Sequence, residues 1–530
     1  MPINPVACMR ATILSGCLTI ALATAMFPVR GLAVQREKQS SSSKAEVVSV
    51  KDPACRQAGP KGCLGLALEA MGGQARLQTI KSLGLETARH TLLVEQSYRQ
   101  SPFITSYERL KIKIDFAGNR IYRETHQSWP ESDPGDSESD SILVAGRTGG
   151  VNRSSTDSPC SLADLDWVRQ TLALGPARLL LTALEASDLR FGQPELVRST
   201  MHTVLNFTWQ GMPVKIALNP WNHLPDAMET VEQFQDHWYQ WGDVHRRIYF
   251  ENYKVFHGIV YPTNEVEERN QIAWRSSQVL NLDLNTAVDE DQFRMDAKAA
   301  ERSTQSKGWE RPFPGGKNTE LAPGISLYEF SWNSTLVKQD DGVVVLEAPL
   351  SWVYTKGLVE EVGRRYPGVP IKAVVSTSDS WPHVGGVRQA VALGLPVYIL
   401  DLNRPLLDAL VHAPRKLHPD TLEQSPKAPR WQIVSQRLVL GTGQNRMEFY
   451  PLRGASTERQ YMVFFPEHHL LYVSDTLSLD DKGALYDPEL MREVIQAVKR
   501  EGLQVNTAFA MHQGPVPWAK IIELVEKAMN

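Results

Sequence analysis

The sequence predicts an α+β protein with two folded domains: an antiparallel sheet domain with helices, followed by a layered αβ domain. Between residues 64 and 295, apolar side chains alternate with polar ones, which is the period of half-buried strands. From Gly324 onward, short apolar strands alternate with helical segments, as in layered domains. Residues 296–323 are charged and then rich in Pro and Gly, which is typical of an interdomain linker. A chain of 530 residues is also long for a single hydrophobic core.

The first 33 residues have the composition of a secretory signal peptide. Arg10 precedes an apolar run over residues 11–29, and small residues precede a cleavage point after Ala33. The run is also just long enough for an uncleaved anchor, which would then be the protein's membrane contact. Cys17 lies in a sequence that looks like a lipoprotein cleavage box, a third possibility. Residues 34–62 are expected to form a flexible linker, so we predict export to the periplasm or beyond, within a bacterial cell envelope.

Composition favours an ordinary globular protein that does not bind nucleic acid. Hydrophobic residues make up 42% of the chain, charged residues 22%, and the formal net charge is -4. There is no long basic stretch of the kind that binds phosphates. In an oxidising compartment Cys55 and Cys63 are expected to form a disulfide, leaving Cys160 free or paired with another chain.

The first folded domain is predicted over residues 63–295. A helix is expected over residues 64–71, ended by a Gly–Gly pair. The clearest strand covers residues 110–116 and turns at Gly118-Asn119. Further strands are predicted at residues 121–123, 203–209, 214–218, 245–253 and 255–261, and a short apolar helix at residues 176–184. Residues 130–141 are acidic and are expected to form a mobile loop.

Several short motifs in this domain resemble the LolA/LolB-like periplasmic fold. They are Gly72-Gly73 with Leu77, residues 80–83, Trp241-Gly242-Asp243, and Tyr253 with Gly258 and Pro262. The resemblance implies a curved antiparallel sheet wrapped around a helix, with an apolar pocket for a lipid-like or other small-molecule ligand. A purely structural sheet domain is the alternative that these residues leave open.

The second domain is predicted over residues 324–530. Strands are expected at residues 343–346, 372–375, 397–400, 447–450, 461–465 and 470–473, and helices at residues 355–366 and 405–411. The strands are short apolar runs, as in sheets that are buried on both faces. The pattern therefore predicts sheets covered by helices.

Six motifs in this domain resemble, in order and spacing, the metallo-beta-lactamase superfamily. They are residues 333–337, Glu347-Ala348-Pro349, Ser376-Thr377, residues 383–386, residues 471–476 and residues 511–514. The resemblance covers nearly all of residues 324–530. It implies an αβ/βα sandwich and a hydrolase that uses one or two metal ions, usually zinc.

That family holds its metals with an HxHxDH run, a mid-domain His, a bridging Asp and a final His. The substituted positions here are Ser378, Ser380, Pro382 and Ser456, and the retained ones are His383, Asp475 and His512. A serine hydroxyl is a poor zinc ligand at neutral pH, so the first metal position is expected to be empty. Asp379 lies between two of the serines and, on a strand-like run, is expected to point away.

Two functions follow from this degenerate site. The first is an inactive or atypical hydrolase homologue, a pseudoenzyme, that binds a ligand and no metal. The alternative is a hydrolase of an ester or amide that uses one zinc or other divalent ion. That ion would be held by His383, Asp475 and His512, because two imidazoles and a carboxylate match a three-ligand site with an open position.

A metal-free nucleophile is also conceivable. Ser376, Ser378 and Ser380 alternate next to His383, and Asp475 could orient that histidine. This would be a Ser–His–Asp arrangement, recognised by its geometry and not by its order in the chain.

Overall fold

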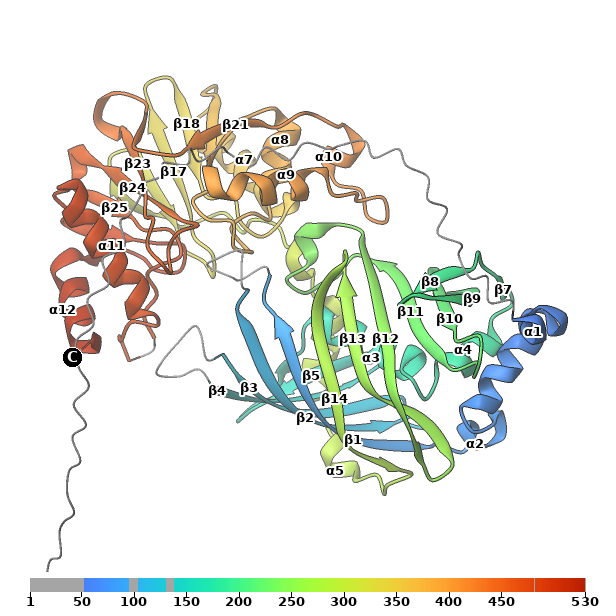
Figure 1. Ribbon diagram of the computed structural model, residues 1–530. Coiled ribbons are helices and arrows are strands. Elements are labelled where there is room, and N and C mark those ends of the chain that lie inside the picture. Colours follow the sequence, from blue (N-terminus) through green and yellow to red (C-terminus); the bar gives the residue numbers. More distant parts are fainter. Residues whose placement is uncertain (1–51, 95–102, 130–137, 481, 530) are drawn as a thin grey trace, which may run out of the picture. The chain divides into compact units, whose positions relative to one another are not determined.

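The computed structural model describes residues 52–94, 103–129, 138–480 and 482–529. The predicted signal peptide, and the predicted linker up to residue 51, lie outside the described residues. No helix in the described part is both long and apolar enough to cross a membrane. The described residues form one large antiparallel sheet domain and one layered domain with two sheets (Figure 1).

A single antiparallel sheet builds the first domain. Its strands are β1 (Ser82–Leu92), β2 (Thr105–Asp115), β3 (Arg120–Ser128), β4 (Glu138–Gly146), β5 (Gly149–Arg153), β6 (Ser158–Pro159), β7 (Arg190–Phe191), β8 (Glu195–Val197), β9 (Thr200–Trp209), β10 (Met212–Leu218), β11 (Pro225–Glu232), β12 (Val244–Phe256), β13 (Ile259–Arg269) and β14 (Ile272–Leu284). Their order is β6-β5-β4-β3-β2-β1-β14-β13-β12-β11-β10-β9-β7, with β8 on β9. Most neighbours are consecutive hairpins, and the predicted turn between β2 and β3 is confirmed, with Asn119 in the left-handed region at φ 53°.

The sheet curves around helix α3 (Leu162–Leu174) (Figure 1). Leu165 of α3 belongs to the same buried core as Ile112 of β2 and Phe250 of β12. These two strands lie on opposite sides of the β1–β14 pair, so the curvature of the sheet brings both into the core that α3 shares. The helix therefore forms the inner wall of a half-closed sheet.

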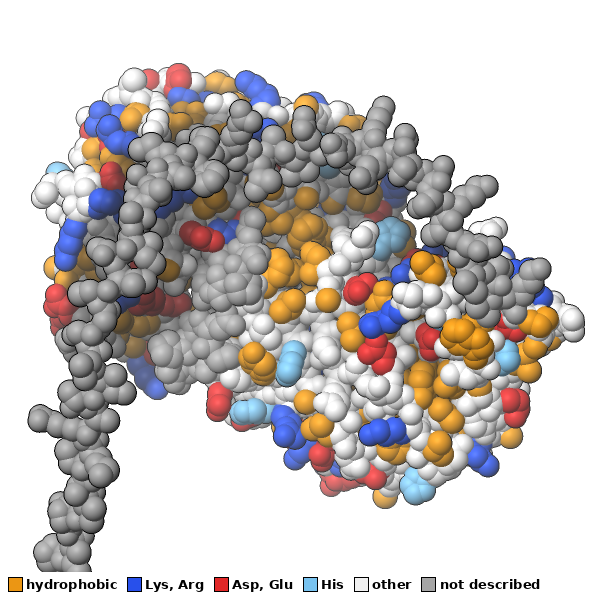
Figure 2. Space-filling view, in the orientation of Figure 1, with side chains coloured by type: hydrophobic (Ala, Val, Ile, Leu, Met, Phe, Trp, Pro, Cys, Tyr) orange, Lys and Arg blue, Asp and Glu red, His pale blue; other side chains and the backbone are white. Residues whose placement is uncertain are grey.

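The outer surface of the sheet domain is mixed in character. On the face that Figure 2 shows, hydrophobic side chains of this domain are interspersed with acidic and basic ones. Val255 of β12, for example, is 70% exposed. Single exposed apolar side chains of this kind are normal on a protein surface, so the domain's apolar character is concentrated in its interior.

Helix α1 (Pro53–Ala70) begins well before the helix predicted over residues 64–71. Asp52 accepts a hydrogen bond from the backbone N–H of Cys55 (3.1 Å), which caps the first turn. Gly59 (φ 71°) only kinks the helix. The predicted flexible linker over residues 34–62 is therefore wrong for its last residues, because the helix accommodates Gly59 and Pro60 as a kink.

The predicted disulfide between Cys55 and Cys63 is confirmed, and Cys160 is a buried free thiol. Replacing both paired cysteines by serine is expected to lower the free energy of unfolding by about 2–3 kcal/mol, because the bond closes a short loop in the unfolded chain. Denaturant unfolding of the oxidised protein and of the double variant measures this loss. Identical midpoints for the two would contradict the expectation.

Two segments predicted to be irregular are ordered. Residues 138–141 of the predicted loop belong to β4, and residues 130–137 lie outside the described residues. The predicted linker 296–323 contains helix α6 (Ala297–Gln305), whose Ala299 packs with Val151 of β5. The linker also includes β15 (Thr319–Ala322), the edge strand of the next domain. The charged residues of helix α6 lie on its solvent-exposed face, so they do not indicate a flexible chain.

The second domain contains two sheets. The first runs β15, β16 (Ile325–Tyr328), β17 (Ser334–Gln339), β18 (Gly342–Leu346), β19 (Ile371–Val375), β20 (Pro396–Leu400) and β21 (Arg430–Val434). The second runs β22 (Leu438–Leu440), β23 (Met447–Pro451), β24 (Tyr461–Phe465), β25 (Leu470–Tyr472), β26 (Thr507–Phe509) and β27 (Val516–Pro517). The main helices are α7 (Trp352–Arg365), α8 (Val387–Leu393), α9 (Arg404–His412), α10 (Thr421–Gln424), α11 (Pro488–Glu501) and α12 (Trp518–Met529).

The two sheets pack face to face between two helical layers. Val344 of β18 and Phe449 of β23 share the core between the sheets. A second core joins the outer face of the first sheet to α7, α8 and α9, and a third joins the outer face of the second sheet to α11 and α12. The order helix–sheet–sheet–helix agrees with the αβ/βα sandwich predicted for residues 324–530.

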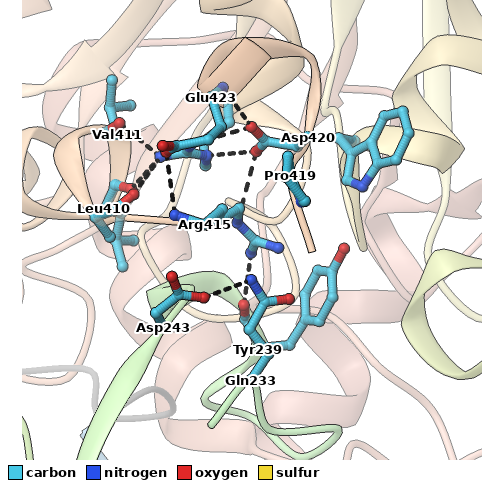
Figure 3. A network of polar contacts seen from close by, with 12 residues as sticks. Gln233, Tyr239, Asp243, Leu410, Val411, Arg415, Pro419, Asp420 and Glu423 are labelled. Atoms are coloured by element: carbon cyan, nitrogen blue, oxygen red, sulfur yellow. Dashed lines mark hydrogen bonds and ion pairs between the residues drawn. The ribbon is translucent and has the colours of Figure 1, made fainter. Parts of the chain in front are cut away.

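A buried polar network links the sheet domain to the segment before α10 (Figure 3). Arg415 Nη2 donates to the carbonyl oxygen of Tyr239 (2.6 Å), and the Asp243 carboxylate accepts backbone N–H groups of the same segment. Asp420 accepts from Arg388 Nε (2.6 Å) and lies 3.5 Å from Arg415 Nε. Its side chain is 1% exposed, so two buried guanidinium groups share one buried carboxylate.

Candidate functional site

His383, Asp475 and His512 come together at one edge of the sandwich, from the loops that follow β19, β25 and β26. One ligand atom of each residue lies within 4.8 Å of the others. His383 Nε2 is 3.4 Å from Asp475 Oδ2, and His512 Nε2 is 3.0 Å from Asp475 Oδ1. The structure therefore brings together the three residues predicted as metal ligands, which are far apart in the sequence.

The second ring nitrogen of each histidine faces an acceptor. His512 Nδ1 is 2.9 Å from the carbonyl oxygen of Ser331, which fixes the proton on that nitrogen. His383 Nδ1 is 3.6 Å from Glu347 Oε2. Both rings therefore direct Nε2 toward Asp475, the way in which outer acceptors orient metal-binding imidazoles.

The cluster has strongly perturbed ionisation. His383 is fully buried, and burial opposes its charge, but Asp475 and Glu347 together raise the pKa of its imidazole to about 10. Burial also opposes the charge of Asp475, yet the two histidines lower the pKa of this carboxyl well below its usual range. At neutral pH and without a metal, His383 is an imidazolium between two carboxylates.

Glu347 is held rigidly beside this cluster. Its Oε1 accepts hydrogen bonds from the backbone N–H (3.1 Å) and the hydroxyl of Thr377, and from the Tyr472 hydroxyl (3.3 Å). The backbone is in the left-handed region at Glu347 (φ 67°) and at Ser474 (φ 57°), directly before Asp475. Such conformations cost about 1 kcal/mol or more each for non-glycine residues, and they concentrate at functional sites.

The four substituted ligand positions are engaged in loop contacts. Ser378 Oγ accepts from the backbone N–H of Ser380 (3.1 Å), and Ser380 Oγ donates to a neighbouring carbonyl oxygen. The carbonyl oxygen of Pro382 accepts a backbone hydrogen bond. The backbone N–H of Ser456 donates to the Glu493 carboxylate (3.1 Å). These contacts stabilise the loops. They do not replace the three missing imidazoles as metal ligands.

The Ser–His–Asp hypothesis is not supported by the geometry. Ser376 Oγ donates to the carbonyl oxygen of Ser378 (3.2 Å), and the other two serine hydroxyls make the loop contacts described above. Across the described residues, no hydrogen bond joins a hydroxyl of these serines to the His383 ring; only the backbone N–H of His383 donates to the carbonyl oxygen of Ser380 (2.8 Å). The conceivable nucleophile is therefore not aligned with a base.

A buried ion pair between Arg459 and Asp379 was missed at the sequence level. The two side chains are 3% and 2% exposed. The sequence predicts that Asp379 points away, but residues 376–380 are irregular and residues 381–386 form turns, so the alternation of a strand does not apply to them. Burial lowers the pKa of Arg459 to about 10, which leaves it cationic at neutral pH. The only sequence signal was an Asp and an Arg in the two loops that carry the substituted ligand positions.

These residues line a cleft of about 370 Å³. Its wall includes Ser380, Arg459, Asp475, Ser478 and His512, and it extends to Ile104 and Trp129 of the sheet domain. A small molecule of moderate size would therefore contact the cluster and the Arg459–Asp379 pair together.

No protein-family model matches this chain, and no curated protein matches it. Similar solved structures include the stereoselective inverting sec-alkylsulfatase Pisa1 from Pseudomonas sp., with 14% identity over 39% of this chain and 40% of that chain at a TM-score of 0.29. They also include the DIM-1 metallo-beta-lactamase, with 16% identity over 41% of this chain and 99% of that chain at a TM-score of 0.32.

A metallo-beta-lactamase from Pontibacter korlensis is similar as well, with 14% identity over 40% of this chain and 99% of that chain at a TM-score of 0.31. The chain spans only 40% of the length of the alkylsulfatase. Its structural neighbours are thus metallo-beta-lactamase-fold proteins and alkylsulfatases over about 40% of the chain.

Proposed function

We propose that the second domain is a metallo-beta-lactamase-like hydrolase that holds one divalent metal ion, zinc or a similar ion, through His383, Asp475 and His512. The single observation that carries this proposal is that both imidazoles direct Nε2 at one carboxylate while an acceptor faces each Nδ1. Two neutral imidazoles and a carboxylate fit a three-ligand site with an open position. The substrate would be an ester or an amide.

Other residues of this chain would orient the metal ligands and the substrate. A bound ion would lower the pKa of water and polarise a carbonyl group. Glu347 would keep the Nδ1 proton of His383 in place, and the Ser331 carbonyl would do the same for His512, so that both Nε2 lone pairs stay available. The hydroxyls of Ser380 and Ser478 line the cleft and would orient polar groups of the substrate.

Hydrolysis of a panel of chromogenic esters and amides tests this proposal. We expect activity that chelation removes and added zinc restores, that His512→Ala lacks, and that His469→Ala keeps. His469 is the matched control, because its Nδ1 also faces a carbonyl oxygen but it lies in an exposed turn away from the cleft. Hydrolysis that survives both chelation and His512→Ala would overturn the proposal.

Metal affinity is expected to increase with pH. Because the pKa of His383 is raised to about 10, an incoming ion must displace one proton from this residue at every pH below that value. The apparent affinity should therefore increase about tenfold per pH unit between roughly pH 6 and pH 8. Competition titration with a zinc-binding dye measures the slope, and an affinity that is constant over this range would contradict it.

A second candidate is a ligand-binding protein whose hydrolase-like domain is inactive. It is favoured by a partly open cavity of about 130 Å³ in the sheet domain. Apolar residues such as Leu83, Ile112 and Phe250 line the cavity, and Arg89 and Glu265 place charges beside them. Such a cavity suits a lipid-like ligand with an apolar chain and a polar end, consistent with the LolA-like resemblance.

A fluorescent fatty acid tests the second candidate. Val279 lines the cavity, so Val279→Trp is expected to weaken binding of the probe, while Val255→Trp, on a side chain that is 70% exposed, should leave it unchanged. Equal binding by both variants would reject the cavity as the site. This assay does not depend on any metal.

We also propose that the protein is exported to the cell envelope. The Cys55–Cys63 disulfide supports this, because such bonds persist in oxidising compartments. Sequencing the N-terminus of the protein recovered from the periplasm or the medium tests it, with a start directly after Ala33 expected. An intact N-terminus in a cytosolic fraction would reject it.

A further inference from the structure

Arg459 and Asp379 occupy the region of the cleft where the resemblance would place the first metal. Asp379 lies between Ser378 and Ser380, and Arg459 follows Ser456 in the same loop. The ion pair joins these two loops directly. The loops that would hold three imidazoles around a cation thus hold a guanidinium group instead.

Arg459 is fixed in position. Asn403 Nδ2 donates to the carbonyl oxygen of Arg459 (2.8 Å), which anchors the backbone of this loop. The side chain is 3% exposed and is part of the cleft wall. A buried arginine held in this way loses little conformational entropy when it binds a ligand.

The guanidinium group has more donors than the structure supplies acceptors. Asp379 forms an ion pair with Nη2, and across the described residues neither Nε nor Nη2 has a hydrogen-bond acceptor. An arginine carries five N–H donors, and buried donors without acceptors are costly. Oxygen atoms of a ligand in the cleft would supply the missing acceptors.

The other charged groups of the cleft already have partners. Asp475 is paired with His383 and His512, and Asp487 caps α11 by accepting from a backbone N–H. Within the described residues that line the cleft, Arg459 is the only arginine or lysine. It is therefore the position where a negative charge on a ligand is best compensated.

We propose that the cleft recognises a substrate with an anionic oxygen group, bound by Arg459, next to the ester or amide that the metal cluster would act on. The substrate class is thus an anionic ester or amide, whose anion is a carboxylate, a sulfate or a phosphate. The role in hydrolysis rests on the proposed function, whereas anion binding by Arg459 does not. Arg459 is the specificity residue in this proposal, and Asp379 competes with the ligand for its charge.

Calorimetric titration of the full-length protein with inorganic phosphate, inorganic sulfate and acetate tests the proposal. We expect Asp379→Asn to bind at least one of these anions more tightly than the wild type does, because the competing carboxylate is removed. The double variant Arg459→Gln with Asp379→Asn, which keeps a neutral hydrogen-bonded pair, should lose about tenfold or more in affinity relative to Asp379→Asn, as expected for charge-assisted hydrogen bonds. Arg437→Gln, which changes an arginine outside the cleft, should match the wild type.

Each outcome of the titration has one meaning. A preference for acetate assigns a carboxylate, and a preference for sulfate or phosphate assigns that ester. Anion binding that persists in His512→Ala supports Arg459 as the residue that binds the anion. If His512→Ala loses anion binding but the double variant keeps it, the anion is bound by the metal and the proposal is overturned. Equal affinities in Asp379→Asn and the double variant, or no binding of any probe, also overturn it. Hydrolysis of neutral esters alone would leave the proposed function standing and reject this inference.

Discussion

Asp420→Asn is expected to lower the free energy of unfolding by about 3–5 kcal/mol, more than the loss of the Cys55–Cys63 disulfide would. The Asp420 carboxylate pairs with Arg388 and Arg415, and all three side chains are almost fully buried. Asparagine would keep the size of the side chain but leave two buried cations without their anion. Because Arg415 also donates to the carbonyl oxygen of Tyr239, the contact between the sheet domain and the sandwich should weaken as well.

Denaturant unfolding of Asp420→Asn beside Asp401→Asn measures this effect. Asp401 pairs with Arg453 near the surface, where both side chains are about one-third exposed, so its loss should cost about 1 kcal/mol or less. A loss for Asp420→Asn that is as small as that of the control would show that the two arginines find other partners.

Glu347→Gln is expected to weaken metal binding about 10- to 100-fold without removing any ligand. The Glu347 carboxylate lies 3.6 Å from His383 Nδ1, and its negative charge would favour a proton on that nitrogen and so leave Nε2 for the ion. A glutamine amide can still contact Thr377, but it provides no negative charge to stabilise the ring in this state. The change is thus specific to the orientation and basicity of His383.

Glu448→Gln is the matched control for that experiment. Glu448 is also a buried glutamate of the second domain, and it pairs with Arg437 away from the cluster. Competition titration should give this variant the affinity of the wild type. Equal affinities for Glu347→Gln and Glu448→Gln would contradict the role of Glu347, while equal losses in both would point to a general effect on folding.

Much of the strand pattern and the disulfide could be predicted from the sequence, because each depends on local features. The alternation over residues 110–116 and the apolar runs at residues 343–346 and 372–375 correspond to β2, β18 and β19. Boundaries were less predictable. The predicted linker over residues 34–62 overlaps the start of helix α1, which begins at Pro53 and accommodates Gly59 and Pro60 as a kink.

The candidate site could be predicted only in part. The convergence of His383, Asp475 and His512 followed from the resemblance, and the structure shows it, whereas metal binding by them stays a prediction. Glu347 and the Arg459–Asp379 pair could not be assigned roles, since burial and partner choice depend on how distant loops meet. The alternation rule also failed at Asp379, because it holds for strands and this segment is irregular.

We propose that half of a two-metal site survives as a one-metal site, and metal analysis of the full-length protein purified without chelator tests this most directly. We expect nearly one equivalent of zinc, iron or manganese in the wild type. We expect less than about a tenth of an equivalent in His512→Ala, because loss of one of three protein ligands removes the tight binding that such sites need. Less than about a tenth of an equivalent in the wild type itself would contradict the claim and leave a ligand-binding protein with an inactive hydrolase frame.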